Sequence, residues 1–578
     1  MDLRYKYITE KEELTKALAR LEKSPFLFMD TETAGDRIRL FQVGNEQDIF
    51  VIDLFELPQV VPVIKELLSQ KGVVGHNLKF DLKFLYRLGI QPYATFDTMI
   101  GSFLLGYERH SLSHVAERLL GYTLDKSLQL SDWSRSILTK QQVEYAAVDV
   151  LVVRELFFKM REKLNNLPAV DRGEELLKTR TARIFELKNP ATIIEMAFVQ
   201  EVARLELNGI PVDKEEIDRL YKEYERKLQK LIMDFYIKHR IDPMSTKQVG
   251  QFLKSRLGLE LPETHKGNIS TDDRTLSEFS HVKEVRDILE IRKVKKALDK
   301  LRELSSFVKD RRVYPEFRQI GAVTGRMSSS NPNVQNIPRD MRSLFKAEEG
   351  KVFVIADFSQ IELRIAAEYV QDENMLRAFR EGRDMHRYTA SLVLEKPETE
   401  VSKEERQLAK AMNFGLIYGI SARGLSEYAR SSYGVELEIE SADIFRKKFF
   451  KHFSAFKRWH DRVKEELKEN KEVEGSTLMG RPYKATTFTD AVNYPVQGTG
   501  ADLLKLAVLM FDVEIRKKGI DARIVNLVHD EIVVECGEDI SHEIKSSLEH
   551  AMIQAGHIVL KHVPVEVESS ISNRWLKD

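Results

Sequence analysis

The stretch Arg523–Cys536, RIVNLVHDEIVVEC, places two adjacent acids, Asp530 and Glu531, between two apolar runs. The runs 524–528 and 532–534 are rich in β-branched residues and therefore predict two strands. Three residues between two strands predict a tight hairpin at the end of a buried sheet. Two carboxylates crowded at such a tip repel each other, and a bound cation would reverse that repulsion. The stretch therefore predicts an acidic metal site.

A second apolar strand that ends in an acid supplies a partner for Asp530. The run VFVIADF, residues 352–358, carries Asp357 near its end. Carboxylates from two separate strand ends can hold two metal ions a few ångströms apart, which suits in-line phosphoryl transfer. Magnesium is the expected ion, because it keeps water and substrate phosphates as its other ligands.

The stretch RQLAKAMNFGLIYG, residues 406–419, combines cations and aromatic rings at a helical spacing. Arg406, Lys410, Phe414 and Tyr418 recur every four residues and would form one slowly drifting stripe. The two cations suit a triphosphate, and the two rings suit a sugar and a base. An amphipathic helix with its aromatics in the core is the alternative, but it does not explain why cations and rings share a face.

The first 168 residues alternate short apolar strands with helical patterns, which indicates an α/β fold. Polar residues recur there in pairs whose spacing places each pair on one face of a strand or helix: Asp30 with Glu32, Asn77 with Asp81, and Tyr145 with Asp149. Four acids on three elements can converge on one pocket. Two divalent cations would neutralise them and activate a water for phosphodiester hydrolysis, with Tyr145 orienting that water.

Together these motifs resemble two known families. The order D-x-E, N-x3-[FY]-D and Y-x3-D resembles the DEDDy 3′–5′ exonucleases. The motifs D-F-S-Q-I-E-L-R, R-x3-K-x3-F-G-x2-Y-G and V-H-D-E resemble motifs A, B and C of family A DNA polymerases of the bacterial type. Three further stretches agree with the second resemblance: Thr324–Pro338, Asp384–Ala390 and Asn493–Lys505.

The resemblance implies a multidomain protein of α/β and α+β class. Residues 1–168 would form an RNase H-like 3′–5′ exonuclease domain, and residues 169–578 a right-hand polymerase domain. The thumb, palm and fingers are expected at about 214–315, at about 316–400 with 473–578, and at about 401–472. No Gly/Ser-rich linker is present, so we expect the domains to pack directly on one another. A 5′ nuclease domain is not expected.

The thumb is expected to contact DNA through its basic helices. From Lys283 to Arg312, eleven Lys or Arg residues stand against six Asp or Glu residues. Such helices would meet DNA phosphates without reading sequence. Thr264–Asp273 would lie near the thumb tip.

The resemblance also assigns roles to individual residues. In the polymerase site it implies two Mg²⁺ ions held by Asp357, Asp530 and Phe358, with Glu531 beside them. In the exonuclease site it implies two divalent ions, Mg²⁺ or Mn²⁺, held by Asp30, Glu32 and Asp149, with Asp81 and Tyr145 completing the site.

The incoming deoxynucleoside triphosphate would meet Gln360, Glu362, His386, Arg406, Lys410, Phe414 and Tyr418. Glu362 would crowd the sugar 2′ position, Phe414 would lie against the deoxyribose, and Tyr418 would sit near the templating position. Primer–template DNA would contact Arg326, Asn336, Asn493, Gln497 and His529. The stretch after Gln335–Pro338 is shorter than usual in the family, so Arg339 and Arg342 receive no role.

Composition sets the remaining expectations. The chain has 42% hydrophobic and 31% charged residues and a single cysteine, Cys536, and it lacks a signal-peptide pattern and a membrane-spanning apolar run. A cytoplasmic monomer without membrane contact, acting in DNA replication or repair, is therefore expected. The net charge of −1 does not argue against DNA binding, because clustered charge matters more than the total.

Two other functions are alternatives to a template-directed polymerase with proofreading. One is a 3′–5′ exonuclease on RNA or DNA whose C-terminal half is only a nucleic-acid clamp. The other is a catalytically inactive scaffold. The pair Asp357 and Asp530 and the stripe 406–418 favour the polymerase, because a clamp needs neither a second metal site nor a triphosphate-binding helix.

Overall fold

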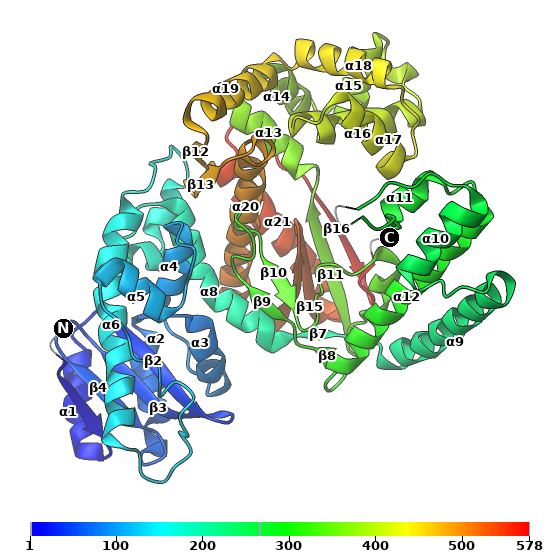
Figure 1. Ribbon diagram of the computed structural model, residues 1–578. Helices are drawn as coiled ribbons and strands as arrows, with labels where there is room; N and C mark the ends of the chain where they lie inside the picture. Colours follow the sequence, from blue (N-terminus) through cyan, green and yellow to red (C-terminus); the bar gives the residue numbers. More distant parts are fainter. Residues whose placement is uncertain (1–2, 265–266, 577–578) are drawn as a thin grey trace.

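The computed structural model describes residues 3–264 and 267–576, and its N-terminal α/β region is followed by a larger region of mixed helices and strands (Figure 1). The N-terminal region is built on one six-stranded sheet in the order β1-β4-β3-β2-β5-β6. Its strands are β1 (Tyr5–Ile8), β2 (Phe26–Ala34), β3 (Arg37–Gly44), β4 (Ile49–Asp53), β5 (Gly72–Gly75) and β6 (Ala94–Asp97). The short apolar strands predicted for this region include β2, β4 and β5. Strand β2 continues far enough to include Glu32.

Helices cover this sheet. They are α1 (Lys11–Leu21), α2 (Val61–Ser69), α3 (Leu78–Arg87), α4 (Thr98–Leu104), α5 (Leu112–Leu120) and α6 (Lys140–Asn165). Helix α6 starts with a capping box, in which Thr139 and Gln142 satisfy each other's backbone N–H groups. This fixed start sets the rotation of the helix and thereby the direction of Asp149.

A mainly helical stretch connects the two regions. It contains α7 (Arg180–Phe185), α8 (Pro190–Asn208), α9 (Lys214–His239), α10 (Thr246–Leu257), α11 (Asp273–Glu278) and α12 (Lys283–Phe307), together with the short strands β7 (Ile210–Pro211) and β8 (Arg312–Val313). Helix α8 packs on α3 and β6 on one side and on α20 (Phe488–Lys518) on the other. One apolar cluster therefore runs through both regions, and they pack directly, as expected.

Helices α9 to α12 enclose an apolar core of their own, separate from the main cluster. Figure 1 shows these green helices on one side of the central sheet, opposite the N-terminal region. The segment Thr264–Asp273, predicted to lie near the thumb tip, includes His265 and Lys266, which lie outside the described residues.

The central sheet has the order β14-β15-β11-β16. Its strands are β11 (Lys351–Phe358), β14 (Ala522–Val528), β15 (Glu531–Gly537) and β16 (Val567–Ser572). Helices α20 and α21 (Ser541–Val559) pack against each other, and α21 covers the sheet. Short hairpins, β9 (Glu316–Arg318) with β10 (Ser328–Ser330) and β12 (Val473–Ser476) with β13 (Pro482–Ala485), border it.

The predicted hairpin at 523–536 exists, but its turn is shorter than expected. Glu531 is already the first residue of β15, where it pairs with Val528. The turn consists of His529 and Asp530 alone, with His529 in the left-handed region at φ 57°. Two-residue hairpin turns need such a conformation, because it matches the twist of the flanking strands.

A second group of helices lies beyond the sheet, at the top of Figure 1. It comprises α13 (Ile361–Val370), α14 (Glu373–Arg380), α15 (Met385–Leu394), α16 (Lys403–Ile417), α17 (Ala422–Tyr433), α18 (Ile439–His452) and α19 (Ser454–Asn470). Helix α16 also starts with a capping box, from Ser402 and Glu405. Within residues 3–264 and 267–576, no helix is both long and apolar enough to cross a membrane.

Two candidate active sites

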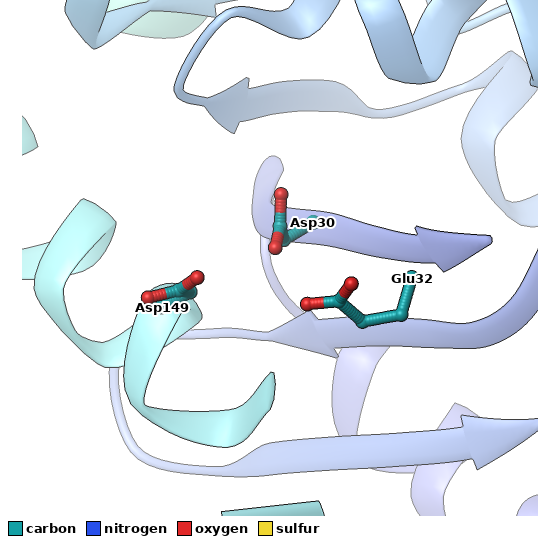
Figure 2. Close-up of side chains that lie close together, drawn as sticks. All are labelled: Asp30, Glu32 and Asp149. Atoms are coloured by element: carbon teal, nitrogen blue, oxygen red, sulfur yellow. The ribbon is translucent and has the colours of Figure 1, made fainter. Parts of the chain in front are cut away.

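Three of the four predicted acids of the N-terminal region come together. Asp30 and Glu32 project from β2 and Asp149 from α6, and their ligand oxygens all lie within 4.8 Å of one another. Figure 2 shows the three carboxylates turned toward a common point. Hard oxygen ligands from a strand and a helix, gathered in this way, fit a divalent cation.

The fourth acid, Asp81, lies beside this cluster and does not belong to it. Thr31 donates its hydroxyl hydrogen to Asp81 Oδ1 at 2.6 Å. Asn77 was predicted to share a helix face with Asp81, and this prediction was wrong. Asn77 precedes α3 in a left-handed conformation, with φ 59°, and its N–H donates to Asp97 at 2.9 Å.

The acids of this site repel one another, and their pKa values are raised. Burial, followed by the negative charge of Asp149, raises the pKa of Glu32 to about 8. Burial and the charges of Asp81 and Asp149 hold the pKa of Asp30 well above its usual range. Burial raises the pKa of Asp81 to about 7. Without a cation the cluster therefore retains protons near neutral pH.

Lys126, which the sequence analysis missed, partly balances this negative charge. Its ammonium group donates to both carboxylate oxygens of Asp149, at 2.8 and 2.9 Å, and to the Tyr145 hydroxyl at 3.2 Å. The residue lies in the loop between α5 and α6, where no spacing pattern distinguishes it from other surface lysines. Tyr145 and Asp149 share a face of α6, as predicted.

Metal affinity at this site should increase with pH. The raised pKa values mean that the acids bind protons that a divalent cation must displace. Affinity should therefore rise from pH 6 to about pH 8, by roughly tenfold per pH unit for each proton released, and level off above that range. Calorimetric titration of the metal-free protein with Mn²⁺ at several pH values measures this. An affinity independent of pH would contradict the protonated state of the cluster.

The second acidic site lies at one end of the central sheet. Asp357 is near the end of β11, and Asp530 lies in the adjacent turn. The backbone N–H of Phe358 donates to the carbonyl oxygen of Asp530 at 3.3 Å, which joins the two segments. Burial, then the charge of Asp357, raises the pKa of Asp530 to about 7. Two half-buried acids that repel each other in this way fit a divalent cation.

Glu531 lies in β15 and not in the turn that carries Asp530, contrary to the expectation of two acids at one tip. It pairs with Asp357 across β11 and β15, and the Trp575 indole N–H donates to its Oε1 at 2.7 Å. Arg342 lies 3.4 Å from both carboxylate oxygens. Of the two adjacent acids, Asp530 therefore fits a cation, and Glu531 faces an arginine and an indole.

The predicted stripe of α16 is only partly helical. Arg406, Lys410 and Phe414 lie within the helix, whereas Tyr418 is the residue that caps its end. Arg406 Nε donates to Asp384 Oδ2 at 2.8 Å, and the Lys410 ammonium lies 5.9 Å from the Tyr433 ring. Arg406 and Lys410 therefore lie one turn apart on α16, and Tyr418 lies just beyond the end of the helix.

His386 joins this group from α15. Its ring lies 5.9 Å from the Phe414 ring. Burial, then the positive charge of Arg406, lowers the pKa of His386 to about 4, so the ring is neutral. The Asn413 side-chain amide donates to Nδ1 at 2.9 Å, which leaves the ring proton on Nε2.

Glu362, on α13, connects the two halves of this site. It accepts a hydrogen bond from Arg326 Nη2 at 2.6 Å and another from the Tyr418 hydroxyl at 2.7 Å. Gln360 precedes α13 in a left-handed conformation, and its side-chain oxygen is buried without a hydrogen-bond partner among the described residues.

The five residues predicted to bind DNA gather around one cavity of about 650 Å³. They are Arg326, Asn336, Asn493, Gln497 and His529. The side-chain oxygen of Asn493 is buried and lacks a partner in the part of the chain that the structure describes. Burial, then the charge of Arg326, lowers the pKa of His529, so this wall of the cavity combines a neutral imidazole with a cation.

Comparison with known proteins places this geometry in a family. Residues 214–577 match the family model described as DNA polymerase family A. The chain belongs to this family. Residues 5–165 match the model described as 3′-5′ exonuclease, so this family A polymerase carries both activities. The alternative of an exonuclease with a nucleic-acid clamp is thereby set aside. Both domains imply the use of divalent metal ions.

Relatives support the assignment over the whole chain. A DNA polymerase I from Aquifex aeolicus is 63% identical over 99% of this polymerase and 100% of that protein. A DNA polymerase I from Pseudomonas aeruginosa is 30% identical over 96% of this chain and 64% of that protein. One similar solved structure is the POL domain of Pol1 from M. smegmatis in complex with DNA primer-template and dNTP. The two chains are 24% identical, and the match covers 98% of this chain and 99% of that chain. The TM-score of 0.81 shows a shared fold.

Proposed function

We propose that Asp357 and Asp530 hold two Mg²⁺ ions and that this site extends a primer on a DNA template. The observation that carries the proposal is the meeting of these acids at the sheet end next to the 650 Å³ cavity. When bound, the two ions would stabilise the attacking and leaving oxygens of an in-line displacement. Phe358 fits beside them, because its backbone adjoins Asp530.

The triphosphate would bind along α16. Arg406 offers a planar fork, Lys410 a point charge, and neutral His386 a single N–H at Nε2. Phe414, beside His386, is in position to contact the sugar. Arg406 now bonds to Asp384, so the incoming phosphate would replace a carboxylate as its partner.

Primer–template DNA would occupy the cavity lined by Arg326 and its four neighbours, with α9 to α12 as the thumb. Several cations of α12 are engaged in ion pairs, such as Lys295 with Asp299, so fewer of them are available for phosphates than the charge count implied. The protein would act as a cytoplasmic monomer in replication or repair.

In the N-terminal site, Asp30, Glu32 and Asp149 would hold two divalent ions and remove mismatched 3′ ends. Tyr145 would orient the attacking water, and Asp81 would act from beside the cluster through Thr31.

Primer extension with Mg²⁺ tests both sites together. A matched primer should be extended by all four deoxynucleotides, and a primer with a 3′ mismatch should first be shortened. Extension without a template, or extension of the mismatch without trimming, would contradict the proposal.

Glu362→Ala should admit ribonucleotides. The carboxylate is held by two hydrogen bonds in a fixed position, and its removal opens space for a 2′-hydroxyl. Relief of about 1.4 kcal/mol of steric cost for the 2′-hydroxyl corresponds to a tenfold change in rate, so the ratio of ribo- to deoxynucleotide incorporation should rise by about tenfold or more.

Tyr418→Phe is the matched control for this change. It removes one bond to Glu362 but keeps the carboxylate and the ring, so discrimination should change far less. If the ratio of kcat/KM for ribonucleotides to that for deoxynucleotides is the same in Glu362→Ala and in the unchanged protein, residues other than Glu362 discriminate between the two sugars.

A further inference from the structure

The C-terminal segment reaches the polymerase site through Trp575. This side chain is 1% exposed, and its backbone N–H donates to the carbonyl oxygen of Phe345 at 3.0 Å. The rings of Trp575 and Phe345 pack edge to face, with centroids 5.3 Å apart. Arg574 adds an ion pair to Asp213 at 2.7 Å. The indole is therefore fixed from several directions.

Arg342 lies between this indole and Glu531. Its guanidinium carbon is 4.4 Å from the centre of the Trp575 ring, within the range of a cation–π contact. One of its nitrogens is 3.4 Å from both oxygens of Glu531, a distance that suits an ion pair better than a strong hydrogen bond. Glu531 is only 4% exposed, so its charge needs such a partner.

The position of Glu531 determines the position of Asp530. Glu531 closes the two-residue turn by pairing with Val528, and it faces Asp357 on the other side. Asp530, the residue directly before Glu531, lies in that turn. A displacement of Glu531 therefore moves the Asp530 carboxylate relative to Asp357, and metal sites tolerate only small displacements of this kind.

We propose that Arg342 and Trp575 are positioning residues of the polymerase site, which hold Asp530 opposite Asp357 by fixing Glu531. This inference rests on the proposed role of Asp357 and Asp530 as metal ligands. It gives Arg342 a role that its sequence context left open, and it makes the C-terminal segment part of the site. Glu531 then acts by holding the turn and does not itself bind metal.

Trp575→Phe tests the role of the indole N–H, because it keeps an aromatic ring against Arg342. We expect kcat for nucleotide addition to fall about tenfold, with KM for the nucleotide and Kd for primer–template within twofold. Trp133→Phe is the matched control: this indole is also buried, and its N–H has no partner among the described residues. It should leave extension unchanged.

Metal binding supplies a readout that does not depend on turnover. In a background that carries Asp30→Ala and Glu32→Ala, bound Mn²⁺ measured by electron paramagnetic resonance reports on the polymerase site. Trp575→Phe and Arg342→Met should each weaken this binding by about three- to tenfold. Arg342→Lys should restore part of it, since the charge returns without the planar group.

Unchanged kcat and unchanged Mn²⁺ affinity in Trp575→Phe and Arg342→Met would overturn the proposal. If Trp575→Phe fails to fold, the two Arg342 variants decide: recovery by Lys supports a positioning role, and equal loss in both overturns it. Asp530→Asn separates this inference from the assignment of the site, because active Asp530→Asn would refute the site itself, whereas an active Trp575→Phe refutes only the positioning role.

Discussion

Asp530→Asn should abolish primer extension and leave 3′–5′ hydrolysis intact. The change keeps the shape of the side chain and removes its charge, so the turn that carries it should be preserved. A metal ligand of a phosphoryl-transfer site contributes several kcal/mol of transition-state stabilisation, so the extension rate should fall by roughly three or more orders of magnitude. Single-turnover extension, with digestion of a single-stranded primer in parallel, measures both rates.

Asp521→Asn is a matched control for Asp530→Asn. Asp521 is an exposed acid just before β14, and its Oδ1 forms an ion pair with Arg523 Nε at 3.4 Å. It should leave both rates unchanged. Extension by Asp530→Asn at more than a few per cent of the normal rate would show that the metal ions are held by other residues.

The sequence predicted the elements of both sites because their signals are local. Apolar runs rich in β-branched or aromatic residues predict strands: the run 352–358 lies in β11, with Asp357 near its end, and Asp30 lies within β2, which continues to Ala34. The two-residue period of a strand also placed Asp30 and Glu32 on one face. These inferences need only the geometry of a single element.

Predictions that depended on where an element ends were less accurate. Asn77 and Tyr418 lie one residue outside their helices, and Glu531 lies within a strand instead of the turn. A spacing of four residues does not reveal a left-handed residue at a helix start. It also does not show whether a hairpin turn has two residues or three, because both fit the same apolar pattern.

Contacts between distant segments were beyond the reach of the sequence. Lys126 joins Asp149 from a loop without a motif, and Trp575 joins Glu531 from 44 residues away along the chain. A single lysine or tryptophan gives no periodic signal. Both become visible only when the fold brings them to a buried carboxylate.

Asp30→Ala with Glu32→Ala should have the opposite effect to Asp530→Asn. Two of the three clustered carboxylates would be lost, and Asp149 would remain with Lys126 as its partner. The site should then bind divalent ions too weakly for hydrolysis, and trimming of mismatched primer ends should fall by three or more orders of magnitude. Extension of matched primers should persist, because the polymerase site keeps its own acids. Mismatched ends would then be left in place or extended slowly.

The same double change should stabilise the metal-free protein at high pH. The pKa of Asp30 and that of Glu32 are raised in the fold, so the folded state binds more protons than the unfolded state, and stability falls as pH rises toward and beyond 8. Without these acids the melting temperature in EDTA at pH 9 should rise. Asp36→Ala with Glu117→Ala, two exposed acids of the same region, should change neither trimming nor this temperature. Trimming at the normal rate by Asp30→Ala with Glu32→Ala would mean that the N-terminal region hydrolyses DNA with other residues.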